Sequence, residues 1–339
     1  MSVVQSIAKI KQVSAQEPHH ITALRQAARA RAATLKFPTR ADEAWHFTDP
    51  APLQKMQFRP VTKAGDIDRA DVEKFIVPEA ASRLVFVDGV YAPELSQTGS
   101  DRVLSFQQAW LSHADLITAH FGLHIDHKED IFIAQNTAEW QDGAFVWLGK
   151  NDTQPVHILY IATGQDSAKV IYPRLLIMAE SQTKTSVVED YVALGEQVYF
   201  SNCVTEIVVQ DGAELNHSKI QREAKTAFHV ANCNVQLGKN SQYKSQTISL
   251  GARLSRYNLR ITQSGEGAHA ELDGLALING RQTADTRTEM DHAKPHGSSS
   301  QLHKCIVDGA AHAVFNGIVY VRKDAQLTDS KQSSRNLLL

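Results

Sequence analysis

The chain has 339 residues, of which 42% are hydrophobic and 21% charged, so it can bury a large core and does not have the composition of a disordered segment. Its formal net charge of -2 provides no basic surface for nucleic acid, and no apolar run approaches the roughly 20 residues that cross a bilayer. We therefore expect no nucleic-acid partner and no membrane partner. The first residues lack the continuous apolar segment of a secretory signal, which predicts a cytoplasmic location.

Residues 1–80 are predicted to form an N-terminal helical region. Apolar residues recur at helical spacing over residues 3–35 with a break at Pro18, which indicates a helical hairpin or a bent helix. A short motif follows, in which Glu43, Trp45 and Thr48 stand in the sequence PTRADEAWHFT. We expect Trp45 to be an aromatic anchor that fastens this region to the next domain, with Glu43 as a helix cap or ion-pair partner.

Residues 81–128 are predicted to be a mixed α/β connection. Residues 84–91 have the pattern of a hairpin with a glycine turn, and residues 106–121 that of a helix. Strand-like sequence then dominates from residue 129 to 339, beginning with 130–138, 142–148, 154–160 and 186–191. Residues 129–339 are therefore expected to form one β-rich core.

A loose repeat runs through this core. Strand-like runs flank turns at Gly212, Gly238, Gly265 and Gly309, which lie 26, 27 and 44 residues apart, and we interpret the last interval as two shorter coils divided at Gly280. A period in the twenties with short strands indicates a solenoid, in which each coil buries its apolar face against its neighbours.

The solenoid is predicted to be a parallel β-helix, because helical repeats do not fit the strand-like composition and a leucine-rich ladder is absent. Outward positions are expected to be rich in Gln, Lys, Ser and Thr. The alternating aliphatic residues are expected to point inward: Val204, Ile207, Val209, Val230, Val235, Leu237, Leu259 and Ile261.

The motifs of several enzyme classes are missing from the sequence. It has no phosphate-binding P-loop and no Gly-x-Ser-x-Gly nucleophile elbow. Cys203, Cys233 and Cys305 form no CxxC pair, and each is expected to be a reduced, buried, small hydrophobic residue. We therefore predict no catalytic residue.

Metal-ligating residue types gather loosely near the end of the sequence, at His292, His296, His303 and Cys305. Pro295 and the glycine and serines after it make residues 291–300 a loop, in which His and Ser side chains are expected to satisfy backbone groups. The four residues remain candidate metal ligands beside this structural interpretation. No cofactor is expected to be bound by this chain alone.

Dense motifs in the last coils carry a family resemblance. The sequence has DTRT at 285–288, SSSQLHK at 298–304, VFNG at 314–317 and NLLL at 336–339. Together with the Trp45 motif, these resemble the SufB/SufD family of iron–sulfur cluster assembly scaffolds, the SufD branch most closely. The resemblance implies a mainly β protein, with a right-handed parallel β-helix core after an N-terminal α-helical region.

The resemblance also implies a non-catalytic scaffold subunit of the SufBCD complex. Such a subunit pairs with SufB or with itself, works with the SufC ATPase, contributes to iron acquisition, and meets an iron–sulfur cluster transiently at the level of the complex. The partner-pairing edge is expected at Val314, Phe315, Asn316, Gly317, Val319 and Val321. Family members continue into a C-terminal helical domain that docks SufC, so the sequence is expected to be either a fragment or a shortened homologue.

Two other interpretations stay open. Parallel β-helices also form polysaccharide lyases and hydrolases, in which Asp285, Arg287, Glu289, Asp291 and His292 would supply acid and base groups. The lack of a secretory signal and the motifs at both ends count against that class. A third interpretation is an interaction module with no metal involvement.

Overall fold

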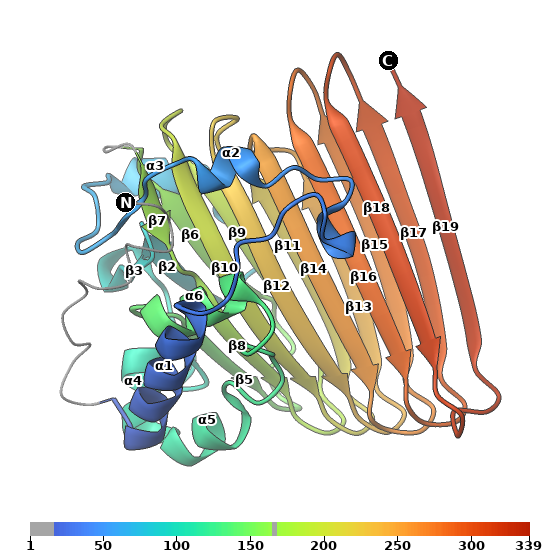
Figure 1. Cartoon of the computed structure of the whole chain (residues 1–339). Coiled ribbons are helices and arrows are strands. Elements are labelled where there is room, and N and C mark those ends of the chain that lie inside the picture. Colours follow the sequence, from blue (N-terminus) through green and yellow to red (C-terminus); the bar gives the residue numbers. More distant parts are fainter. Residues whose placement is uncertain (1–16, 165–167) are drawn as a thin grey trace.

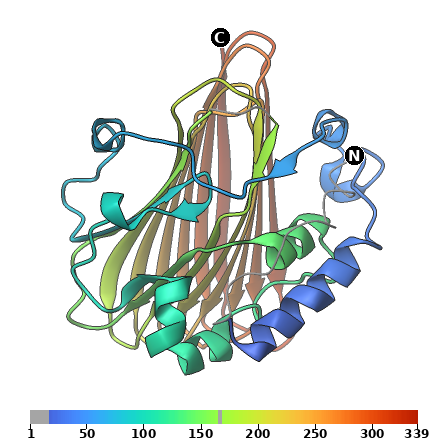
Figure 2. The ribbon, with the colours of Figure 1, turned by 90° about the vertical axis from the view of Figure 1, so that its left-hand side faces the viewer.

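A computed structural model describes residues 17–164 and 168–339, and its main body is a parallel β-solenoid of about seven turns. From β8 onward, successive strands alternate between two sheets, so that each turn of the chain adds one strand to each sheet. Figure 1 shows the strands stacked from the N-terminal coils to the C-terminal ones, and Figure 2 shows the two sheets facing each other around one interior. The predicted mainly β, parallel β-helix fold class is confirmed.

The first sheet, sheet A, has the order β18-β16-β14-β12-β10-β8-β5-β4, and β7 pairs with both β10 and β1. Its strands are β1 (Arg59–Pro60), β4 (Val103–Ser105), β5 (Ala144–Leu148), β7 (Lys169–Ile171), β8 (Arg174–Ala179), β10 (Tyr199–Val209), β12 (Phe228–Leu237), β14 (Leu254–Gln263), β16 (Thr283–His292) and β18 (His312–Val321).

The second sheet, sheet B, has the order β19-β17-β15-β13-β11-β9-β6-β2-β3. Its strands are β2 (Ser82–Val87), β3 (Val90–Tyr91), β6 (Val156–Ala162), β9 (Lys184–Ala193), β11 (Glu214–Arg222), β13 (Gln242–Ser249), β15 (His269–Ile278), β17 (Ser298–Val307) and β19 (Asp329–Leu338).

The helices lie in the N-terminal part and outside the sheets (Figure 2). The α-helices are α1 (His19–Ala32), α2 (Ala51–Gln54), α3 (Arg69–Glu73), α4 (Phe106–Ser112), α5 (Ala114–His120) and α6 (Ile131–Glu139), and the 3-10 turns are η2 (Glu43–Trp45) and η3 (Pro93–Leu95). In the described part of the chain, no helix is both long and apolar enough to reach across a bilayer.

Several local predictions are confirmed. A helix begins directly after Pro18, an antiparallel hairpin pairs β2 with β3, and two short helices cover residues 106–120. The helical turns predicted before Pro18 lie largely outside the described residues. The predicted β-rich core began at residue 129. In the structure, the parallel pairing of the solenoid already includes β2, which pairs in parallel with β6.

The strand predicted at residues 130–138 is wrong, because this segment forms α6. Asp130 caps the helix, since its carboxylate accepts hydrogen bonds from the backbone N–H groups of Phe132 and Ile133 at 2.7 and 3.0 Å. Every residue of α6 is buried. The helix begins with the short apolar run Ile131–Ala134, and periodicity cannot distinguish such a run from a buried strand.

The interpretation of the 44-residue glycine interval is also wrong. Register offsets between paired strands are 26 to 31 residues throughout the regular coils, with no shortened coil. Gly212, Gly238 and Gly265 lie in turns from sheet A to sheet B, whereas Gly280 and Gly309 lie in turns from sheet B to sheet A. The 44-residue interval therefore joins two different edges of the solenoid.

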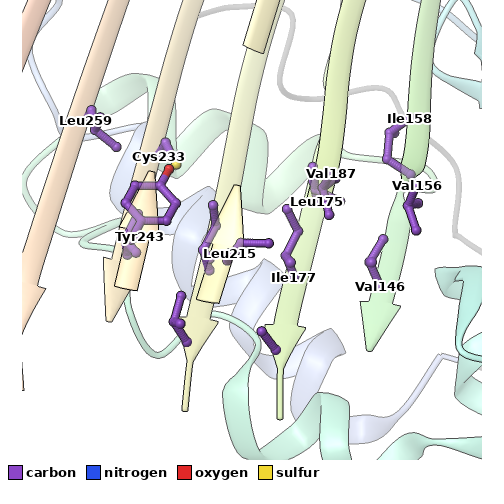
Figure 3. Packing of buried hydrophobic residues seen from close by; sticks show 14 of the residues in the cluster. Val146, Val156, Ile158, Leu175, Ile177, Val187, Leu215, Cys233, Tyr243 and Leu259 are labelled. Carbon is purple, nitrogen blue, oxygen red and sulfur yellow. The ribbon is translucent and has the colours of Figure 1, made fainter. Parts of the chain in front are cut away.

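The hydrophobic core fills the space between the two sheets, where side chains of alternate residues meet (Figure 3). It includes the predicted Ile207, Val235 and Ile261. Val204 and Val230 are buried too, but in clusters on the outer face of sheet A, where N-terminal side chains cover them. Their predicted inward orientation is therefore wrong, because the N-terminal region makes both faces of these strands apolar.

Candidate functional site

The Trp45 motif joins the N-terminal region to the outer face of sheet A. The Arg256 guanidinium lies 4.1 Å from the centroid of the Trp45 ring and forms a buried ion pair with Asp285. The Thr48 hydroxyl donates a hydrogen bond of 2.5 Å to the same Asp285 carboxylate. Trp45 is thus the anchor that the sequence predicted, while Glu43 is exposed and has no such contact.

The strand predicted as a partner edge is β18, and its residues fall into two groups. By register with β16, Phe315 pairs with Thr286 and Val319 with Met290, both of which face the interior. Phe315, Gly317, Val319 and Val321 therefore point inward, and Val314 and Asn316 point outward. Only part of the predicted set belongs to the outer surface.

His303 is held inside the solenoid by an aromatic stack. Its ring lies parallel to that of Phe315, with centroids 4.5 Å apart and planes 9° apart. A Cβ on Gly274 would lie 2.1 Å from Nδ1 of His303, so the bare glycine makes room for the ring. Burial lowers the pKa of His303 to about 4, which keeps the imidazole neutral at physiological pH.

His292 uses both ring nitrogens within the fold. Nδ1 lies 2.7 Å from the Gln263 side-chain oxygen and Nε2 lies 3.1 Å from the Ser299 hydroxyl. It stands at the end of strand β16 rather than in a loop, and its partners are side chains rather than backbone groups. That part of the loop prediction is wrong, because the turn begins only after His292.

The four metal candidates are not brought together. His296 lies in the turn between β16 and β17 with φ of 58°, and its Nε2 is 3.9 Å from Glu266. Cys305 packs into an apolar cluster with alanines and with Ile278. Across residues 17–164 and 168–339, no three His, Cys, Asp or Glu side chains are arranged to hold one metal ion.

The acidic residues of the lyase interpretation are each engaged with an arginine. Asp285 pairs with Arg256, Glu289 pairs with Arg260 at 3.0 Å, and the Asp291 carboxylate accepts hydrogen bonds from Arg322. These contacts neutralise the carboxylates between neighbouring coils. The arrangement favours a structural role for the three carboxylates over acid–base chemistry.

A buried polar network inside the solenoid was not predicted from the sequence. Its centre is Glu189 on β9, which is 1% exposed and accepts hydrogen bonds from His217 at 2.9 Å, from Thr205 at 3.1 Å and from the Tyr191 hydroxyl. Burial by itself would raise the pKa of Glu189, but the His217 hydrogen bond and the charge of Lys219 lower it to about 2. Glu189 is therefore an ionised carboxylate in the core.

Lys219 supplies the positive charge of this network. Its ammonium lies 2.9 Å from Nε2 of His229 and 4.0 Å from the centroid of the Tyr191 ring, and the residue is 2% exposed. On the other side of the His229 ring, Nδ1 lies 2.6 Å from Glu223. Burial and the nearby Lys219 charge lower the pKa of His229, so its neutral ring accepts a hydrogen bond from the ammonium.

The three cysteine thiols have little nucleophilic character. Cys203, Cys233 and Cys305 are free and buried, as predicted. Burial raises the pKa of each thiol, so the thiolate, which is the nucleophilic form, is scarce near neutral pH.

The network overturns the expectation that polar residues mark the outer face. Glu189 and Tyr191 are two residues apart, as are His217 and Lys219, so each pair lies on one side of its strand. This spacing was the available signal. Buried charge is rare unless it is paired, so the spacing alone does not indicate that these side chains point inward.

Comparison with known proteins identifies the two parts of the chain. Residues 6–158 match the family described as the SufBD protein N-terminal region, and residues 160–339 match "SUF system FeS cluster assembly, SufBD core domain". The chain is 36% identical to an iron–sulfur cluster assembly SufBD family protein of Synechocystis sp., over 99% of this chain and 77% of that protein.

Two further relatives extend this similarity. The iron–sulfur cluster assembly protein SufD of Escherichia coli is 31% identical, over 89% of this chain and 70% of that protein. Protein ABCI7, named as chloroplastic in Arabidopsis thaliana, is 28% identical over 89% of this chain and 66% of that protein.

Proposed function

The chain belongs to the SufBD family of SUF-system iron–sulfur cluster assembly proteins, and from this we propose that it is a non-catalytic scaffold subunit of a SufBCD-type complex. The observation that carries the proposal is the match of both family regions along one chain that folds as a solenoid. In this role it pairs with a SufB-type chain or a second copy of itself, works with a SufC-type ATPase, and contributes to iron acquisition in the cytoplasm.

The interior of the solenoid supports a scaffold rather than an enzyme. The ionisable groups of its polar network are paired with one another, and burial raises the pKa of the nearby Cys203 thiol, which is therefore protonated. Fixed, paired groups of this kind specify one arrangement of the coils. The iron–sulfur cluster is then cargo of the assembled complex and is not a resident cofactor of this chain.

The pairing surface is proposed to be the outer face of β18. Val314 and Tyr320 point outward from this strand, and Tyr320 is 51% exposed. Partly exposed apolar and aromatic side chains on the outer face of a strand suit packing against a partner protein.

The proposal is tested by co-expressing the natural reading frame with tagged SufB-type and SufC-type proteins and measuring co-purification. We expect a stable complex that Val314→Lys weakens, because the new charge would be desolvated at the interface. Ile220→Lys is the matched control, since Ile220 is a half-buried, outward-facing residue of sheet B. Failure of the unmodified protein to bind either partner would refute the scaffold assignment.

A further inference from the structure

A cavity lies at one edge of the solenoid, away from β18. It has a volume of about 660 Å³ and forms where α2 meets the turns that lead from sheet B to sheet A. Figure 1 shows α2 crossing the upper ends of these strands. Pro52, Phe228 and Leu254 provide an apolar part of its lining, and the volume is in the range of small-molecule sites.

Three cationic side chains border this cavity, and each comes from a different coil. Lys225 lies in the turn after β11, Arg253 in the turn after β13, and Arg281 in the turn after β15. Neighbouring strands of one sheet are about 4.8 Å apart, so the three turns are stacked within about 10 Å along the solenoid. Asp49 is the one carboxylate among the lining residues, which leaves three positive charges against one negative charge.

No described side chain neutralises these cations. Lys225 donates a hydrogen bond of 2.8 Å to the Asn279 side chain, and the Arg253 guanidinium lies 5.7 Å from the Phe228 ring centroid. Among the described residues, neither they nor Arg281 form an ion pair, and the Asp49 carboxylate accepts a hydrogen bond from a backbone N–H group.

On the outer faces of the two sheets, by contrast, cationic side chains are paired with carboxylates. There, Lys244 pairs with Glu271 of the next coil at 2.9 Å, and Arg260 pairs with Glu289 at 3.0 Å. Like charges on adjacent strands repel each other, so stacking three unpaired cations does not help the fold. Their position around a cavity with an apolar lining indicates a ligand that brings its own negative charge.

We propose that this edge cavity binds a small organic phosphate. The phosphate groups would be held by Lys225, Arg253 and Arg281, since guanidinium groups bind phosphate oxygens in a bidentate manner. The ring or apolar part of the ligand would lie against Pro52, Phe228 and Leu254. This inference concerns the isolated chain and does not depend on the scaffold role.

Calorimetric titration of the purified chain with inorganic pyrophosphate, ADP and adenosine tests the inference. We expect one site for ADP, weaker binding of pyrophosphate, and the weakest binding for adenosine, because it lacks the phosphates. The triple variant Lys225→Gln, Arg253→Gln, Arg281→Gln should lower ADP affinity about tenfold or more, since three charge-assisted contacts are lost. Lys239→Gln is the control, because Lys239 is an exposed cation in a turn at the opposite edge.

Circular dichroism and the unfolding midpoint establish that the triple variant is folded, and all three substituted side chains are exposed. Absence of pyrophosphate and ADP binding at millimolar concentration would overturn the inference. An equal loss of ADP affinity in the triple variant and in the Lys239→Gln control would also overturn it. Binding of adenosine as tight as that of ADP would overturn it too. Complex formation is measured separately, so a negative result here leaves the proposed function standing.

Discussion

Replacing Glu189 by glutamine removes the one charge around which the interior network is arranged. The Glu189 carboxylate has a folded-state pKa of about 2, against an ordinary value of 4.5. A lowered pKa means that the ionised form stabilises the fold, and this difference corresponds to about 3 kcal/mol at pH 7. Glutamine resembles the protonated carboxyl group, so the free energy of unfolding of Glu189→Gln should be lower than that of the native protein by about the same amount.

The sign of the pH dependence follows from the same pKa. The contribution of Glu189 is complete above its unfolded pKa, near 4.5, and is lost as the pH falls through the folded value, near 2. The difference between the native protein and Glu189→Gln should therefore be constant from pH 7 to pH 5 and then shrink. Urea unfolding followed by tryptophan fluorescence at several pH values measures it.

The control for this experiment is Glu214→Gln. Glu214 pairs with Lys184 at 2.8 Å, but both side chains are substantially exposed, so its loss should change stability by less than about 1 kcal/mol. A Glu189→Gln protein that unfolds at the same urea concentration as the native protein at pH 7 would refute the reasoning. So would a stability difference that stays the same down to pH 3.

Three further outcomes are expected. Gly274→Ala should destabilise the protein by about 1–3 kcal/mol, because the new Cβ overlaps the His303 ring, and a second change of His303 to serine should recover part of the loss in thermal unfolding. Thr48→Val should cost about 1–3 kcal/mol in the same assay, since Asp285 loses a buried donor, whereas an unchanged midpoint would contradict that contact. Native protein should react slowly with Ellman's reagent and release three thiols per chain only in denaturant, and fast native labelling would contradict their burial.

The sequence predicted the solenoid because its coils repeat local features. The alternation of apolar and polar residues along the strands and the glycines in the turns recur from coil to coil. Both can be recognised in the sequence without knowledge of contacts between distant residues. The same signals gave wrong predictions of side-chain orientation and of secondary structure where another element covers the outer face of a strand. Val204 is apolar because α6 and Ile125 lie over it, and residues 131–139 resemble a strand because their helix is buried on every side.

The interior network and the edge cavity were not predicted for a different reason. Glu189, His217 and Lys219 come from two strands, and only the register between β9 and β11 brings them together. Lys225, Arg253 and Arg281 are spread over 57 residues and converge because each occupies an equivalent turn. Such sites depend on the length of every coil, and the 44-residue glycine interval did not give the length of the later coils.

The central claim is that this chain acts in assembling iron–sulfur clusters, and cluster content in cells tests it most directly. The measurement is the activity and iron content of a [4Fe–4S] enzyme such as aconitase in an iron-limited strain that lacks the gene, with and without the restored reading frame. We predict reduced cluster occupancy without the gene and recovery with the native copy. Unchanged cluster occupancy in a strain with no other SufBD-type gene would contradict the account.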